Sequence, residues 1–251
     1  MLFRSAFFDQ SQEIFNALKH AGFSAGSYLP LAAIVLAENP GVVESNLDSR
    51  IGRMQQFYQG FKDHHRFLTS QDDYIYAALL ACTDFSVDPS IAAIELIYND
   101  LAKAGLSKNN GLQSLSHVLF LGEQHHSIKV KKAVECYFYL ASKGYKLNEY
   151  HMAFLGVLAL FFDQSMSIID EAINLEQWLK KQTGFGGLTI EKKTRFILAA
   201  SLCIQNYIDE LSHEHKAVLV NSIQAIMMAE QIATTAAIVA ITAAAGASSN
   251  S

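Results

Sequence analysis

The side chains of this sequence that are best suited to chemistry are its histidines. Nine are present, and most gather as His64-His65, His125-His126 and His213-Glu214-His215. Adjacent residues of a helix point about 100° apart, so a doublet cannot ligate one metal ion from a regular helix. Zinc sites on helices use histidines four residues apart, and the sequence contains no such pair. We therefore predict histidines at helix ends and in linkers, with no metal ion and no cofactor.

A second group of polar residues accompanies the leucines of one predicted helix: Gln113, Ser116 and His117. Ser116 and His117 are adjacent, which places them badly as a nucleophile and its base, and the spacing positions no acid beside them. No catalytic residue is predicted. Two interpretations stay open for Gln113, Ser116, His117 and the nearby Lys129: side chains of a pocket for a small molecule, or hydrogen-bonding side chains inside a core.

A glycine-rich segment, Gly184-Phe185-Gly186-Gly187, follows a predicted helix and lacks the spacing of a nucleotide-binding loop. We interpret it as a turn between helices. Basic residues surround it, at 180–181, 192–193 and Arg195. These cations are expected either to complete a helix C-terminus and a solvated helix face, or to dock an acidic partner.

The turns that position these residues recur along the chain. They lie at residues 22, 66, 105, 144 and 184, which gives spacings of 44, 39, 39 and 40 residues. Four turns carry a glycine after a helical pattern, where a left-handed residue closes a helix, and Arg66-Phe67 takes this place in a degenerate second copy. An aromatic residue precedes the glycine in four copies and is expected to wedge between adjacent units: Phe15, Tyr98, Tyr137 and Trp178.

The repeat predicts the fold class. A helical hairpin has two apolar faces and cannot bury both within itself, whereas stacked hairpins cover each other. With only 3 prolines and no sustained two-residue alternation, the sequence predicts an all-α fold. We expect about five stacked helical hairpins over residues 1–211, arranged like an α-solenoid with a period of about 40 residues.

Residues 212–251 depart from the repeat. Glu230 is the only charged residue after Lys216, and alanine dominates the end of the segment. We predict a long Ala-rich helix that caps or docks on the same domain, followed by a polar tail. A membrane contact through this helix is the alternative, although a span needs about 20 consecutive apolar residues and favours leucine over alanine.

Composition restricts the partners and the compartment. The net charge is −5 and the pI is near 6.0, without the basic stripe that nucleic acid requires. The 3 cysteines are far apart and sit in apolar helices, which is typical of reduced thiols in the cytoplasm. The N-terminus lacks the pattern of a signal peptide. We expect a cytoplasmic protein.

Three phrases of the sequence, HAGFSAGSYLPLAA, GLQSLSHVLFLGEQ and LKKQTGFGG, resemble the bacterial family DUF4003. The resemblance runs over nearly the whole chain, but it implies no activity and no functional residues. The leading hypothesis is therefore a non-catalytic helical-repeat scaffold that binds a protein partner or a second copy of itself. A small-molecule-binding or hydrolytic enzyme with a site near Gln113 and His117, and a peripheral membrane protein, are the alternatives.

Overall fold

The computed structural model of the protein describes residues 2–38, 46–186, 190–208 and 226. These residues form ten α-helices and three short 3₁₀ helices, with no strand among them, so the predicted all-α class is confirmed. The α-helices are α1 (Leu2–His20), α2 (Leu29–Glu38), α3 (Leu47–His65), α4 (Tyr74–Ala81), α5 (Val87–Lys103), α6 (Asn110–Phe120), α7 (His126–Ser142), α8 (Met152–Leu160), α9 (Ser165–Leu179) and α10 (Lys192–Ile208). The 3₁₀ helices are η1 (Gln71–Asp73), η2 (Glu149–His151) and η3 (Phe162–Gln164).

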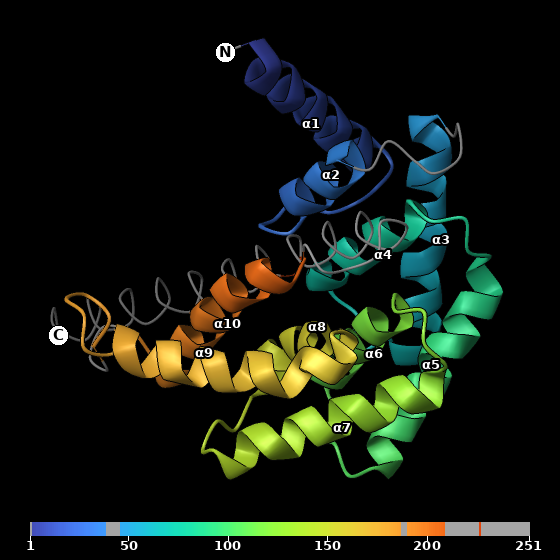
Figure 1. Ribbon diagram of the computed structural model, residues 1–251. Coiled ribbons are helices and arrows are strands. Elements are labelled where there is room, and N and C mark those ends of the chain that lie inside the picture. The colour runs from blue at the N-terminus through green and yellow to red at the C-terminus, as the bar shows by residue number, and fades with distance from the viewer. Residues whose placement is uncertain (1, 39–45, 187–189, 209–225, 227–251) are drawn as a thin grey trace, which may run out of the picture.

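Consecutive helices pair into hairpins. Each odd-numbered helix packs against the even-numbered helix that follows it, from α1 with α2 to α9 with α10. Between hairpins, α2 packs on α4, α6 on α8, α3 on α5 and α5 on α7. Figure 1 shows the odd-numbered helices along the outside of a curved row and the even-numbered helices inside it. Its description as an α-solenoid stays a prediction.

Left-handed glycines close the outer helices at four of the five predicted turns. Gly22, Gly105, Gly144 and Gly184 all have positive φ, between 79° and 98°. At Gly105, the amide of Leu106 donates to the carbonyl of Leu101 and the glycine amide donates to Ala102, which is the Schellman pattern. The second turn, at Arg66-Phe67, achieves the same reversal without a glycine. The glycines therefore mark the hairpin turns as the sequence predicted.

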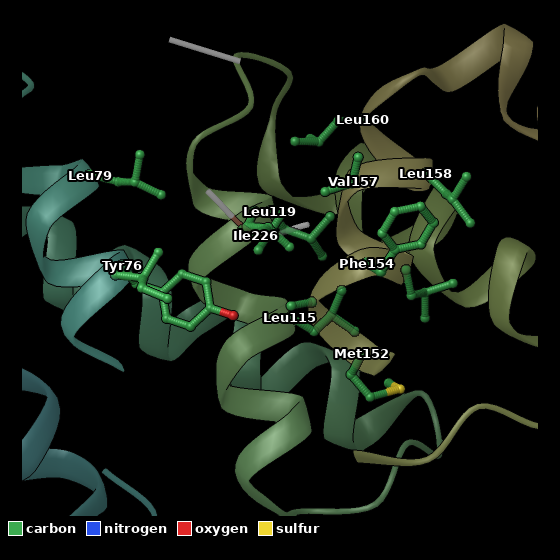
Figure 2. Packing of buried hydrophobic residues seen from close by; sticks show 14 of the residues in the cluster. Tyr76, Leu79, Leu115, Leu119, Met152, Phe154, Val157, Leu158, Leu160 and Ile226 are labelled. Atoms are coloured by element: carbon green, nitrogen blue, oxygen red, sulfur yellow. The ribbon is translucent and has the colours of Figure 1, made fainter. Parts of the chain in front are cut away.

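The inner and outer helices bury different amounts of their surface. The outer helix α5 buries one stripe, which includes Ile91, Ile94, Tyr98 and Leu101. In contrast, the inner helices α4 and α8 are buried at every position, and α6 is buried from Gly111 to Leu119. These three helices form the centre of the core (Figure 2), and α4 and α8 are almost entirely apolar, whereas α6 also buries polar side chains.

The predicted aromatic wedge is wrong in the fifth hairpin. Tyr98 is 4 % exposed, and Phe15 and Tyr137 are half-buried, whereas Trp178 is 56 % exposed. The turn at Gly184 contains one additional residue, and Trp178 lies two residues beyond the wedge position, so it points about 200° away from the expected direction. Counted from the last buried leucine of each helix, Glu176 stands three residues before Leu179, as Tyr98 stands before Leu101. Glu176 is accordingly buried.

Candidate functional site

The three polar candidates of α6 lie inside the protein. Gln113 and Ser116 are 0 % exposed and His117 is 2 % exposed. The Ser116 hydroxyl donates to the carbonyl of Gln113 in its own helix at 2.7 Å. Ser116 is therefore held by the backbone, and His117 lies one residue beyond it on the same helix, so the two do not form a nucleophile and base.

His117 meets an acid that comes from another hairpin. Its Nδ1 lies 3.6 Å from Oδ1 of Asp73, the last residue of η1, which is 0 % exposed. The imidazole stacks on the ring of Phe61 from α3, with 4.0 Å between centroids, and tilts against Tyr76 of α4 at 5.1 Å. Asp73 also accepts a hydrogen bond from the backbone amide of Ser70 at 2.9 Å, which is one half of a capping box at the start of η1.

Burial shifts the pKa values of this acid and this base in opposite directions, each toward the uncharged form. Removal from water, together with the neighbouring Asp72, raises the pKa of Asp73 well above 3.8. Removal from water, and then the nearby His65, lowers the pKa of His117 to about 3. At neutral pH the imidazole of His117 is therefore uncharged. The two groups face each other across the second and third hairpins at 3.6 Å, beyond hydrogen-bond distance, and the raised pKa of Asp73 and the lowered pKa of His117 both disfavour a charge inside the core.

Gln113 makes a parallel link between the same two hairpins. Its Nε2 donates to Oγ1 of Thr69, just before η1, at 2.8 Å. The buried Gln113 Oε1, Asp73 Oδ1 and His117 Nδ1 have no hydrogen-bond partner in the structure. A row of polar atoms thus lies between the second and third hairpins, enclosed by apolar rings. This row of atoms is suited to fix how the two hairpins align, because buried polar atoms lower the stability of the fold unless they face one another.

Lys129 serves a different contact. It lies in α7 and is 5 % exposed, and its Nζ donates to the carbonyls of Gly122 at 2.6 Å and Phe120 at 3.4 Å, where α6 ends. Burial lowers the pKa of this lysine to about 8. The cation completes the C-terminus of α6, which belongs to the preceding hairpin. The pattern recurs in α3, where Nη1 of Arg50 donates to the carbonyl of Leu36 in α2 at 2.6 Å.

The basic residues near Gly184 lie in different environments in the structure. Arg195, expected on a solvated face or in a docking patch, is 2 % exposed and binds Glu176, so this expectation is wrong for Arg195. Lys192 instead donates from Nζ to the carbonyl of Gly144 at 3.0 Å, at the end of α7. That contact agrees with the predicted role of cations at helix C-termini, although the helix is not the one expected.

An open groove lies on the outside of the row, between α3 and the first turns of α5. Its volume is about 960 Å³, and none of the four candidate residues lines it. One wall carries polar side chains of α3, and the other carries Asp88, Pro89 and Ala92 of α5. The remaining lining residues are Gln55, Gln56, Gln59, Gly60, Asp63, His64, Ser86, Val87 and Ile91.

The polar side chains of the groove are partly engaged with the protein. Nε2 of Gln55 donates to the carbonyl of Ala21 at 2.6 Å, and Nε2 of Gln59 donates to Oδ1 of Asp63 at 2.7 Å. Both carboxamides use their nitrogen, so each Oε1 can still accept a hydrogen bond. At the edge of the groove, His64 and His65 lie on either side of Glu95 of α5, at 3.9 Å and 2.9 Å.

Sequence reasoning missed this groove. The signal was present, because Gln55, Gln56, Gln59 and Asp63 share one side of a helix whose opposite stripe, Ile51, Met54 and Phe61, is buried. A polar face of this kind is usually an ordinary solvated face. Only the packing of α5 beside α3 makes it one wall of a groove.

No group of three or more metal-binding side chains is found within the described part of the chain. His213 and His215 lie outside it, as does most of the predicted C-terminal helix. No single helix of the described ranges is long and apolar enough to cross a membrane. One pair, Glu149–Leu160 with Phe162–Leu179, has the length and composition together but is bent by 113°, and its first helix is buried in the core.

Comparison with known proteins gives a family and one distant relative. The model of the family DUF4003, described as a protein of unknown function, matches residues 3–232. The chain is 25 % identical over 236 residues to uncharacterized protein YeaA of Bacillus subtilis (strain 168), an alignment that covers 92 % of this chain and 68 % of that protein. No solved structure gives a significant match.

Proposed function

Since the chain belongs to the DUF4003 family, whose description assigns no activity, we propose a function from the groove: the protein is a non-catalytic helical-repeat scaffold that binds an extended segment of a protein partner between α3 and α5. The match to the family model confirms the resemblance expected from the sequence, but it identifies no functional residue. The observation that supports the proposal is the open groove of about 960 Å³ with its wall of carboxamides and carboxylates.

The groove has the chemistry of a peptide-binding surface. A carboxamide can donate to a backbone carbonyl and accept from a backbone amide, which suits an extended strand of any sequence. Asp63 and Asp88 add negative charge on the two walls, whereas the lining residues include no lysine or arginine. A segment with lysine or arginine is therefore favoured over an acidic one. We expect at least one basic residue in the bound segment.

The interior cluster supports the scaffold over the enzyme. The imidazole of His117 and the carboxyl of Asp73 are enclosed, and neither lines the groove. A general base must be within hydrogen-bond reach of its substrate. The free thiols of Cys82, Cys136 and Cys203 are all buried, which is consistent with the proposed location in the cytoplasm. We include no nucleic acid among the proposed partners.

A library of peptides displayed on phage tests the groove with a defined probe. Peptides are selected on the wild-type protein and retested on Ala92→Trp, which places an indole in the groove. The matched control is Lys131→Trp, at a side chain of α7 that is 79 % exposed. We expect enriched peptides to carry lysine or arginine, to bind Ala92→Trp at least about tenfold more weakly and to bind the control normally. Enriched peptides that bind both variants equally, or a selection without enrichment, would overturn the proposal.

A further inference from the structure

The lysines of the last three hairpins gather at one end of the outer helices. Each of α5, α7 and α9 ends at a hairpin turn, and Figure 1 shows these turns along the lower and left margins of the molecule. The turn segments carry eight lysines and one glutamate, a net charge of +7 in a chain whose net charge is −5. The connections at the other ends of the same helices carry three acidic residues and no lysine or arginine. The turn segments are 103–109, 143–148, 180–186 and 190–193, and the connections are 82–86, 121–125 and 161–164.

Helix dipoles account for only part of this charge. Lys103, Lys143 and Lys180 lie where outer helices end, and a cation is favourable there. Lys108 and Lys146 instead precede the inner helices α6 and η2, where the positive end of a helix dipole disfavours a cation. Both side chains are exposed, and neither forms a salt bridge with a residue that the structure describes. The stability of the fold does not explain their charge, which indicates an anionic partner.

The residue types of the turns distinguish between anionic partners. All eight cations are lysines, whereas protein–protein interfaces favour arginine and contain few lysines. Two large aromatic side chains accompany them: Tyr150 of η2 is 64 % exposed, and Trp178 in the last turn of α9 is 56 % exposed. Tyrosine and tryptophan are typical of the membrane–water interface, where the ring enters the headgroup layer and the polar atom stays hydrated. Lysines beside such rings are better suited to an anionic lipid surface than to an acidic protein.

We propose that the turns of the third, fourth and fifth hairpins bind the anionic headgroups of a lipid bilayer. Three turns define a plane, so a flat surface can contact all of them at once. Each lysine close to an anionic bilayer strengthens binding by about fivefold, so lysines at several turns together give an affinity that one turn does not. The groove between α3 and α5 lies at the other end of α5, and this proposal does not depend on peptide binding there.

Flotation of the full chain with lipid vesicles tests the lysines. One set of vesicles contains equal amounts of phosphatidylcholine and phosphatidylglycerol, and the other contains phosphatidylcholine alone. The test variant combines Lys108→Gln with Lys146→Gln. The matched control combines Lys131→Gln with Lys132→Gln, which removes the same charge from two lysines of α7 that lie near Glu135 at 3.9 Å and 3.1 Å. We expect binding to the anionic vesicles only, at least about tenfold weaker for the test variant and within about threefold of the wild type for the control.

A second measurement needs no substitution. Trp178 is the only tryptophan of the sequence, so the fluorescence of the protein reports on this side chain alone. Anionic vesicles should shift its emission to shorter wavelength and protect it from quenching by acrylamide, and phosphatidylcholine vesicles should do neither. Added salt should reverse both changes, because salt screens the attraction between exposed charges.

Four results would overturn the proposal. Equal binding of the test and control variants would place a membrane contact elsewhere in the chain. Equal binding to both kinds of vesicle would show that lipid charge is not recognised. Unchanged emission of Trp178 in vesicle-bound protein would show that the aromatic side chain does not reach the bilayer. Binding to poly-glutamate without binding to any vesicle would assign the turns to an acidic protein.

Discussion

Arg195 and Glu176 form a salt bridge in the core, with 2.7 Å between Nη2 and Oε1 and each side chain only 2 % exposed. Nε of Arg195 donates to the same oxygen at 2.8 Å, and the hydroxyl of Tyr145 donates to Oε2 at 2.7 Å. Tyr145 follows the turn glycine of the fourth hairpin, and the other two residues belong to α9 and α10. One carboxylate therefore joins the last two hairpins.

Removing one member of this pair should destabilise the protein more than removing both. Glu176→Met or Arg195→Met leaves a buried charge without its partner, and we expect each to lower the free energy of unfolding by about 3–5 kcal/mol. The double variant leaves no charge in the core and should lose clearly less than the sum of the two. Urea unfolding of the four proteins measures the coupling. Strictly additive losses would show that the salt bridge does not couple the helices.

The opposite pKa shifts of Asp73 and His117 predict two opposite pH dependences. The pKa of His117 is lowered from 6.5 to about 3, so between these values the unfolded chain binds a proton that the folded chain does not. Its contribution to stability is therefore lost as the pH falls through this window. The pKa of Asp73 is raised above 3.8, so the folded chain retains a proton that the unfolded chain releases. Its contribution is lost as the pH rises above 3.8.

The two slopes oppose each other in the wild type in the range that begins at about pH 4, and each is at most about 1.4 kcal/mol per pH unit. Asp73→Asn preserves the acceptor for Ser70 and removes one slope, so its stability relative to wild type should rise with pH in this range. His117→Phe preserves the ring on Phe61, and its relative stability should fall with pH. Urea unfolding at several pH values measures both differences. If both differences are independent of pH, the two groups are not buried in the predicted states.

Local features of the sequence predicted the helices and their turns, because a left-handed glycine and a stripe of period 3.6 depend on neighbours only. Glu176 shows where that reasoning ends. Its partners Arg195 and Tyr145 are 19 and 31 residues away, and no local rule distinguishes it from a solvated glutamate. The sequence did not predict the pairing of Asp73 with His117 for the same reason. The sequence was sufficient to name polar candidates, but it did not identify the residues that contact them.

Two glycines with open space around them separate backbone strain from packing. A Cβ at Gly105 or at Gly52 would meet no atom within 4 Å, but only Gly105 has positive φ, at 98°. We expect Gly105→Ala to lower the free energy of unfolding by about 1–2 kcal/mol, because L-residues avoid this conformation. Gly52→Ala, inside α3, should instead stabilise the protein by about 0.5–1 kcal/mol. Thermal unfolding measures both, and changes of equal sign would contradict the assignment of the turn.

Gly111 sets the distance between the third and fourth hairpins. A Cβ at this position would lie 2.3 Å from the carbonyl oxygen and 2.6 Å from the Cα of Glu149 in η2. Both are backbone atoms, so no side-chain rotation relieves the clash, and α6 must move away from η2. We expect Gly111→Ala to lower the free energy of unfolding by about 1–3 kcal/mol or more, as overpacked cores do. Urea unfolding measures the loss against Gly52→Ala, and a Gly111→Ala protein as stable as the wild type would show that the hairpins do not depend on this close contact.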